Sequence, residues 1–451
     1  MRGDRAALAC ALGAIATASA LADQAGRYGP GALALVTLAA ACAAWATGVG
    51  QPWRKEEPAA RARAPWPGPR AAGLLLRAGV LVGLAALLVV KPGTGLRPAH
   101  PPAFHVLAAM ALAVASAPRA TATAWARRLR FPLLAALWTA MAVVVLQKSP
   151  QPCIDVWHYQ QIASEALWSG HNPYSIGYPD ICVHEKLPAG QAAPFSYPPL
   201  TIYAGLPAWL VFGDVRYALL AATLAAAWAI RRLGRTAMAE DAALVLLFHP
   251  KAFFMLEQAW TEPLLLASAA LAAVAALEIR GRWNWVVSGA ALGLAAASKQ
   301  FSLLVLPPFL IALVRPWRLK AAAVAAGVAT LTFLPFLVLS PGDLWYGLVT
   351  YQRTLPFRED SLSWMVPLSR VRGGSMPAWP SLAAAAAVLA ATFPRRGSMA
   401  LAATSAWAAL SAFVLLANRS HFNYHWLAMG LALAAAALHG RESAEAGRRE
   451  P

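Results

Sequence analysis

The chain alternates between continuous apolar runs and short polar segments that carry most of its charge. The runs are rich in Ala and Leu and do not alternate residue by residue, which favours helices over β-barrel strands. Because a helix needs roughly 20 apolar residues to cross a bilayer, the pattern predicts an all-α, polytopic transmembrane bundle of about 14 spans. The runs fall at about 6–22, 31–49, 72–90, 103–117, 131–147, 199–230, 242–256, 262–279, 286–299, 301–314, 321–339, 378–393, 399–417 and 424–438.

Composition supports this assignment. Of the 451 residues, 59% are hydrophobic and only 13% are charged, whereas soluble domains are about 25% charged. The 18 Trp and 15 Phe also argue against a disordered chain. A soluble globular enzyme is therefore excluded, and a multi-pass protein of the inner (plasma) membrane is expected.

The basic residues give the expected orientation. The net charge is +18, but the arginines and lysines lie in clusters between apolar runs, as the positive-inside rule requires, and build no continuous face for nucleic acid. We expect the clusters and both termini to be cytoplasmic, and no nucleic-acid partner. The clusters contain Arg54, Lys55, Arg61, Arg63 and Arg70; Arg119, Arg127, Arg128 and Arg130; Arg231, Arg232 and Arg235; Arg280 and Arg282; Arg315, Arg318 and Lys320; Arg395 and Arg396; and Arg441, Arg448 and Arg449.

One run conflicts with simple alternation. The stretch 199–230 must cross an odd number of times, and Gly213-Asp214 divides it. Either its first half is a re-entrant or interfacial segment, or a flanking prediction is wrong. The outer face then holds the long loops 148–198 and 340–377, a short loop at 418–425 and a tip near 255–262.

The first long loop carries an ordered set of features. Helical apolar spacing predicts an amphipathic helix over 155–169 at the membrane surface, with Asp155 in its first turn. The carboxylate suits an N-cap, a catalytic group or both. Asn172-Pro173-Tyr174 predicts a turn, and Tyr197-Pro198-Pro199 starts the next run with proline at the beginning of a helix.

This order of features resembles the C-type glycosyltransferase superfamily, polytopic enzymes that use polyprenyl-phosphate sugars, and most of all its bacterial polyprenyl-phosphate-mannose mannosyltransferases. The resemblance covers about 150–440 and implies that Asp155 is the catalytic base. The family usually has one span before this loop, whereas five precede it here. We therefore expect additional transmembrane helices at 1–130, a glycosyltransferase-like core at 131–440 and a cytoplasmic tail at 441–451.

Three further segments at the outer side supply candidates for substrate and donor. Glu262 lies within an apolar stretch, where a carboxylate is costly unless it meets a partner or water. Lys299 resembles a basic residue of the family, although a snorkelling lysine would look the same. Arg353 and Arg358 lie outside against the charge bias; they suit the donor phosphate, or pairing with Glu359, Asp360 or lipid headgroups.

The short loop adds Phe422-Asn423-Tyr424, similar to an aromatic-Asn-Tyr segment of the family. His421 and His425 have i,i+4 spacing, which suits a metal only if further ligands converge. We predict no metal site and leave a divalent cation open as cofactor. The predicted substrate-binding residues are His158, Asn172, Tyr174, Glu262, His421 and Asn423, with Lys299, Arg353 and Arg358 at the donor phosphate.

Three functions fit such a chain. The resemblance implies inverting transfer of a hexose, with mannose expected, from a polyprenyl-phosphate sugar to a lipid or cell-envelope glycan acceptor on the extracytoplasmic face. The alternatives are a lipid or glycan transporter or flippase, and a non-catalytic membrane partner. Transporters bury charges at mid-membrane and often show inverted repeats, whereas here the acidic residues lie at loops and helix ends and no repeat is evident.

Two of the four cysteines, Cys153 and Cys182, lie in the first outer loop, on the oxidising side. We predict a disulfide between them, which by chain entropy would contribute about 3 kcal/mol. Two free thiols are the alternative.

Overall fold

The computed structural model describes residues 2–48, 69–119, 121–179, 192–313, 315–374, 376–393 and 397–448. The described part of the chain is 75% helical and contains no strand, so the all-α prediction is confirmed. The helices are α1 (Arg2–Gln24), α2 (Pro30–Thr47), α3 (Pro69–Leu87), α4 (Pro102–Ser116), α5 (Ala124–Lys148), α6 (Asp155–Trp168), α7 (Leu200–Phe212), α8 (Arg216–Gly234), α9 (Ala237–Phe248), α10 (Ala252–Glu257), α11 (Glu262–Glu278), α12 (Trp283–Ala296), α13 (Ser302–Ala312), α14 (Arg315–Leu339), α15 (Pro341–Trp345), η1 (Tyr346–Thr350), α16 (Tyr351–Thr354), α17 (Met365–Arg372), α18 (Trp379–Thr392), α19 (Met399–Leu415) and α20 (Phe422–Ala446).

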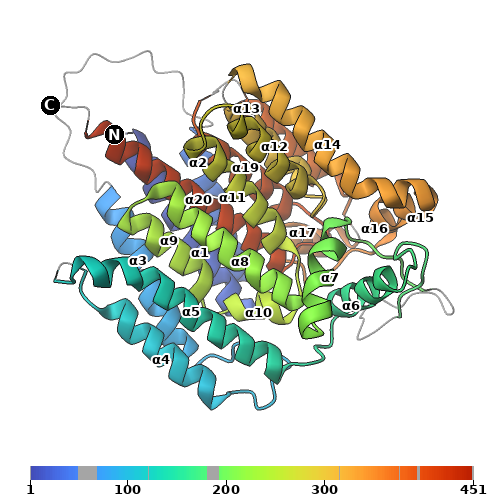
Figure 1. Ribbon diagram of the computed structural model, residues 1–451, viewed down its shortest axis with the longest axis horizontal. Coiled ribbons are helices and arrows are strands. Elements are labelled where there is room, and N and C mark those ends of the chain that lie inside the picture. The colour runs from blue at the N-terminus through green and yellow to red at the C-terminus, as the bar shows by residue number, and fades with distance from the viewer. Residues whose placement is uncertain are drawn as a thin grey trace.

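The first helix packs along the last (Figure 1). Gly3 faces Ser443 at one end of the pair, and Gly26 faces Phe422 at the other, so α1 and α20 run antiparallel over most of their length. Gly26 has φ +77°, and a Cβ there would lie 2.3 Å from the Phe422 Cα atom. Only glycine allows both this backbone conformation and this approach, and the N-terminal helices are thereby packed into the main bundle.

Five helices are long and apolar enough to cross a membrane, or six if a bent pair counts as one span. The bent pair is α7 and α8, which meet at 117°. Gly213, at the break, has φ +72°. The division at Gly213-Asp214 thus produces either a broken span or a re-entrant segment, and the choice between the two alternatives for 199–230 stays a prediction.

The number of about 14 spans is not confirmed. Several apolar runs form helices shorter than a bilayer crossing, such as α9 with 12 residues and α10 with 6. Every α9 residue from Met238 to Phe248 is buried. Its apolar residues therefore fill the interior of the bundle. In sequence, such a buried helix looks the same as a membrane span.

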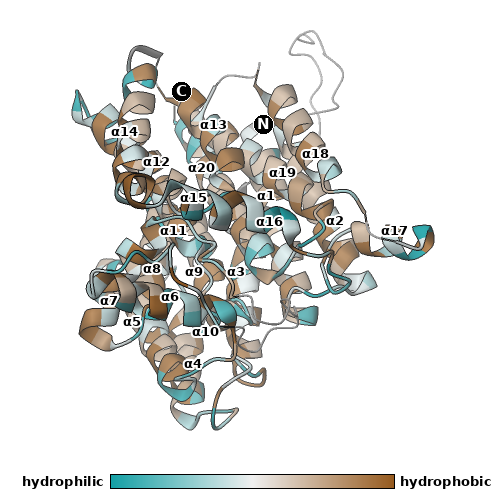
Figure 2. Ribbon diagram, turned by 90° about the vertical axis from the view of Figure 1, so that its right-hand side faces the viewer, coloured by the Kyte–Doolittle hydropathy of each residue, from teal (hydrophilic) through white to brown (hydrophobic). Residues whose placement is uncertain are grey.

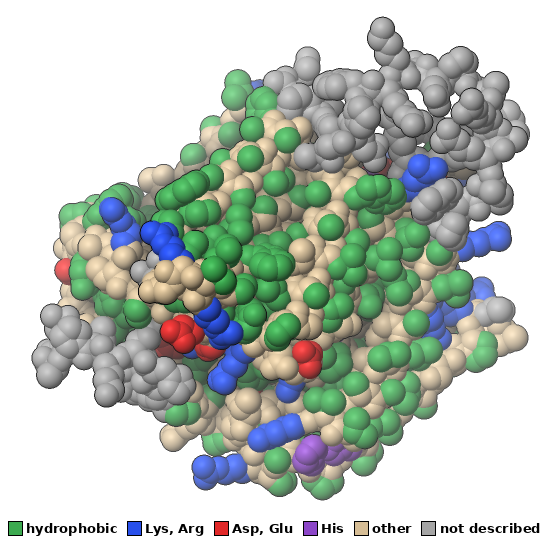
Figure 3. Space-filling model, turned by 180° about the vertical axis from the view of Figure 1, so that it is seen from behind, with side chains coloured by type: hydrophobic (Ala, Val, Ile, Leu, Met, Phe, Trp, Pro, Cys, Tyr) green, Lys and Arg blue, Asp and Glu red, His purple; other side chains and the backbone are tan. Residues whose placement is uncertain are grey.

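The lipid-facing surface is carried mainly by other helices. Hydrophobic side chains cover much of the face in Figure 3, and Figure 2 shows hydrophobic residues along most helices, with hydrophilic residues around α16. In α14, Leu331, Val338 and Leu339 are 68%, 72% and 68% exposed. Such exposure is expected where lipid covers the surface of a membrane span.

Two helices connect the ends of the bundle. Along α5 the chain passes from the arginine cluster at 119–130 to the loop that leads to α6, and along α8 it returns to the cluster at 231–235. At 1.5 Å per residue, the 19 residues of α8 separate the two ends by about 28 Å. The Asp155 end and the arginine end of the bundle are therefore distinct regions.

Some predictions fall partly outside the described residues. These residues exclude Cys182 and the basic residues Arg54, Lys55, Arg61, Arg63, Arg395, Arg396 and Arg449. Cys153 is disulfide-bonded, and Cys10 and Cys42 are free. The pairing of Cys153 with Cys182 stays a prediction.

Candidate active site

The helix predicted over 155–169 is confirmed as α6, which begins at Asp155. Ile154 occupies the N-cap, so Asp155 is the first helical residue and not the cap. Its Oδ1 accepts a hydrogen bond from the Val156 amide at 2.8 Å. The carboxylate is thus held at the positive end of the helix, where a negative charge is stabilised.

Three side chains fix α6 against the rest of the protein. Trp157 donates to Asp214 at 3.2 Å, Gln161 bonds the backbone of Gly213 and Val215 at 2.9 and 3.0 Å, and Gln160 donates to the Ala259 carbonyl at 3.2 Å. Beneath them Arg216 is fully buried and paired with Asp214. The turn that breaks α7 from α8 therefore also sets the position of Asp155.

A pair of loops forms the opposite side of the site. Leu362 N donates to the Ser420 carbonyl at 2.8 Å, and the Ser361 hydroxyl donates to Asn418 O and accepts from Ser420 N, both at 3.2 Å. The α1–α2 connection joins them, because Tyr28 N donates to the Asp360 carbonyl at 2.8 Å. Segments distant in sequence thus hold Arg358, Arg419 and His421 in one place.

Electrostatic interactions connect these loops to α6. Burial raises the pKa of the half-buried Asp155, while the Val156 amide and the guanidiniums of Arg419 and Arg358 lower it. Burial also lowers the pKa of His158. The negative charge of Asp155 acts in the opposite direction and offsets part of this effect. A carboxylate of raised pKa beside cations can accept a proton and share a site with an anion.

His421 and Arg358 complete this group. Burial and the charges of Arg358 and Arg419 lower the pKa of His421 to about 3, although Asp360 raises it. The imidazole is therefore neutral at pH 7. Arg358 donates to Asp360 through Nε at 3.0 Å and Nη2 at 2.9 Å, the ion pair expected as an alternative to phosphate binding.

A second cluster surrounds Glu262, the first residue of α11. Glu262 is fully buried; its Oε1 lies 2.9 Å from Lys299 Nζ and accepts from Asn423 Nδ2 at 2.7 Å. Lys299 also lies 5.0 Å from the Tyr197 ring centre. Burial raises the pKa of Tyr197, and the charges of Asp155 and Glu262 both raise it further, so carboxylates of both clusters act on this ring.

The remaining predicted residues lie elsewhere in the loops. Asn172 forms a turn with Tyr174 N at 3.0 Å, and the buried Tyr174 donates to Tyr197 O at 2.7 Å. Asn172 also bonds Ser340, which joins the first outer loop to the start of α15. These are structural contacts. Arg353 is exposed on α16 and makes no ion pair with any described residue.

The described residues contain no group of three His, Cys, Asp or Glu side chains able to hold a metal. His425 instead bonds Ser420 Oγ at 2.9 Å and the Leu362 carbonyl at 3.1 Å. Its role here is to join the two loops, and His421 does not share a ligand set with it.

One family of known proteins matches part of this chain. The model of glycosyltransferase family 87 matches residues 195–418, which include Tyr197, Glu262, Lys299 and Arg358. The chain is a membrane glycosyltransferase. No curated protein matches it. The family 87 match begins after α6, so Asp155 lies outside the matched residues. Only tertiary contacts of α6 bring it to them.

The sequence interpretation missed Arg419. This residue interacts electrostatically with Asp155 and with His421. A signal for it existed, because Arg419 is a basic residue in an outer loop, the same criterion that selected Arg353 and Arg358. Arg419 was not selected because the histidines and aromatic residues of segment 418–426 were the features considered there.

Proposed function

We propose that this glycosyltransferase moves a hexose, with mannose the expected sugar, from a polyprenyl-phosphate donor to a lipid or cell-envelope glycan on the extracytoplasmic face. The observation that carries the proposal is the half-buried Asp155 carboxylate at the start of α6, which interacts electrostatically with Arg419 and Arg358, in a chain that matches glycosyltransferase family 87. The donor and acceptor of this reaction remain in or near the membrane, and the bent pair α7 and α8, which holds α6, has the length and hydropathy of a membrane span.

The proposed step is a single displacement. The acceptor hydroxyl gives its proton to Asp155 while its oxygen forms a bond to the anomeric carbon. The bond between that carbon and the phosphate oxygen breaks, and polyprenyl phosphate leaves as an anion. One displacement inverts the anomeric configuration, and general-base catalysis of this kind contributes about 10²–10⁴-fold.

Arg419 and Arg358 are proposed to stabilise the leaving phosphate, because guanidinium groups match phosphate oxygens and offset the developing charge. His158 and the neutral His421 are placed to hydrogen-bond sugar hydroxyls. Glu262, Lys299 and Asn423 are proposed to support the sugar-binding side of the site through Tyr197. A transporter is not favoured by the family 87 match.

The test uses membranes that contain the full-length protein and radiolabelled polyprenyl-phosphate mannose. Transfer of label to a lipid or glycan, abolished in Asp155→Asn, supports the proposal. Movement of labelled donor across the membrane without transfer would refute it. The same membranes with polyprenyl-phosphate glucose test the choice of sugar separately from the reaction.

A further inference from the structure

The arginine end of the bundle contains a cavity of about 400 Å³. Its lining comes from the α4–α5 connection, the first turns of α5, the last turn of α8 and the start of α9. Six of the nine lining residues are arginines: Arg119, Arg127, Arg130, Arg231, Arg232 and Arg235, with Thr236, Ala237 and Glu240 completing the wall. We call this the arginine pocket.

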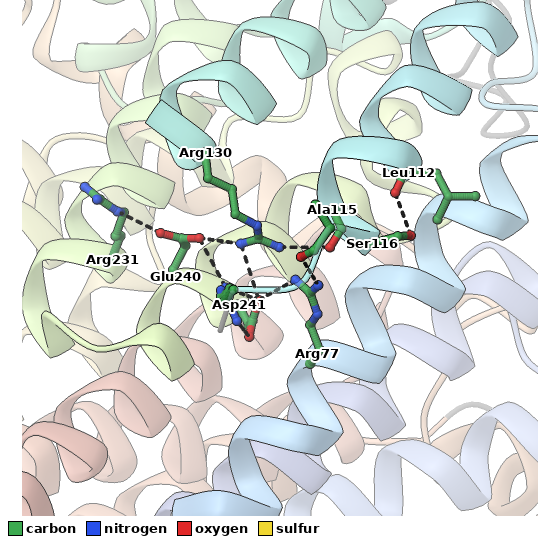
Figure 4. A network of polar contacts seen from close by, with 10 residues as sticks. Arg77, Leu112, Ala115, Ser116, Arg130, Arg231, Glu240 and Asp241 are labelled. Carbon is green, nitrogen blue, oxygen red and sulfur yellow. Dashed lines mark hydrogen bonds and ion pairs between the residues drawn. The ribbon is translucent and has the colours of Figure 1, made fainter. Parts of the chain in front are cut away.

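Three carboxylates organise these arginines, and Figure 4 shows two of them, Glu240 and Asp241. Glu240 pairs with Arg119 at 3.1 Å, with Arg231 at 3.6 Å and with Arg130. Asp241 lies 2.6 Å from Arg119 and 3.9 Å from Arg77 of α3. Each carboxylate therefore contacts more than one cation.

Glu278 pairs with the two remaining arginines of α8 and its C-cap, Arg232 and Arg235, at 2.7 Å each. With Arg77 included, seven arginines of this end face three carboxylates, which leaves an excess of four positive charges among the described residues. Partial neutralisation fixes the guanidiniums in place without removing the positive potential of the pocket.

Two features supply N–H donors in the wall of the cavity. Arg130 has a side chain only 7% exposed, and its buried Nε has no hydrogen-bond partner in the described part of the chain. Thr236 caps α9, so the N-terminus of that 12-residue helix also faces the pocket. Buried N–H donors and a helix N-terminus both favour an anion.

The surroundings indicate that the anion belongs to a lipid. Trp125, at the start of α5, is 72% exposed, and Leu129 and Leu133 on the same helix are 39% and 47% exposed. Tryptophan at a helix end marks the level of the headgroups, with acyl chains beyond it. The pocket thus lies where the polar surface of α5 changes to an apolar one.

The geometry points to a binding site for the phosphate headgroup of an anionic phospholipid, in the leaflet at the end of the bundle opposite Asp155. Basic pockets between transmembrane helices are suited to such headgroups. The α8 helix keeps the site about 28 Å from the proposed reaction. The lipid bound here is therefore separate from the polyprenyl-phosphate donor.

The test measures phosphatidylglycerol and phosphatidylcholine bound to the purified full-length protein by native mass spectrometry. Arg127 and Arg235 are replaced by glutamine together in one double variant. Arg127 has no ion pair among the described residues. Glu278 still pairs with Arg232 when Arg235 is changed. We expect the wild type to prefer phosphatidylglycerol, and each substitution to weaken that binding about fivefold.

The control double variant Arg128→Gln/Arg448→Gln also removes two positive charges, but from exposed positions outside the pocket. It should bind phosphatidylglycerol as the wild type does. Glycosyl transfer measured in phosphatidylcholine checks that both double variants fold. Equal lipid binding by the two double variants would overturn the proposal. Displacement of phosphatidylglycerol by inorganic phosphate with no remaining preference between the lipids would also overturn it, because the pocket would then hold a soluble anion.

Discussion

Asp155 and Glu262 begin two helices on the same side of the protein, and their surroundings differ. Glu262 is fully buried, with Lys299 at 2.9 Å and Asn423 at 2.7 Å. Asp155 is half-buried, makes no ion pair with a described residue, and interacts with Arg419 and Arg358 at longer range. The comparison separates a carboxylate that pairs directly with a buried lysine through one oxygen from one that can exchange a proton.

The Glu262 cluster also has a mechanical consequence. It joins α11, the α12–α13 connection and the start of α20 by direct polar contacts. Since a buried charge without its partner is costly, these helices are held together by electrostatics as well as by packing. Asp155, in contrast, is positioned by α6 and its neighbours and does not itself hold other elements.

The largest effect is expected at Asp155. Asp155→Asn preserves shape but removes the proton acceptor, so sugar transfer should fall by about 10²–10⁴-fold. Initial rates with radiolabelled donor measure this. Glu165→Gln is the matched control, an exposed carboxylate on the same helix, and should transfer at the wild-type rate. Near-normal transfer by Asp155→Asn would reject its role as base.

Next in size is the effect of Glu262→Gln on stability. The substitution leaves Lys299 buried without its counter-charge, which should lower the free energy of unfolding by about 3–5 kcal/mol. The Tm in detergent measures the change, and Glu262→Gln/Lys299→Met should recover part of the loss. If Glu262→Gln kept its Tm and lost transfer, the carboxylate would belong to the chemistry and the comparison with Asp155 would fail.

A smaller effect is expected from Arg419→Gln. Loss of a charged hydrogen-bond donor to the phosphate costs about 1.5–3 kcal/mol, which corresponds to roughly a 10- to 100-fold rise in the donor KM. Arg372→Gln, at an exposed arginine of α17, serves as the control and should change KM little. An equal effect of the two substitutions would mean that general surface attraction, rather than the site, governs donor binding.

The smallest expected effect is a displacement of the pH profile. Transfer requires ionised Asp155, so the rate should rise with pH through the pKa of this group. Burial raises that pKa, and the acid limb should therefore lie above the usual range of an aspartate. Arg419→Gln removes a charge that lowers the pKa, so the limb should move to higher pH. The residual transfer rate of Asp155→Asn can be measured across the same pH range. If its acid limb is unchanged, the titrating group is not Asp155.

Local pattern predicted the elements near the site well. The spacing of Val156, Tyr159 and Ile162 predicted α6 with Asp155 in its first turn, and Gly213-Asp214 marked the break between α7 and α8. Both depend on interactions within a few residues, such as helical periodicity and the left-handed conformation of glycine. The span count was not predictable in this way, because α9 is as apolar as a lipid-facing helix and is covered by protein.

The sequence by itself determined an all-helical membrane protein, the helix that carries Asp155 and the polar outer segments that provide partners. Only the tertiary structure decided which partners meet. Arg419 lies near Asp155, although 264 residues separate them, while Lys299 is held by Glu262 and Arg353 is exposed. The physical reason is range: periodicity and capping act within a few turns of one helix, whereas charges interact according to distances that the packing of remote helices sets.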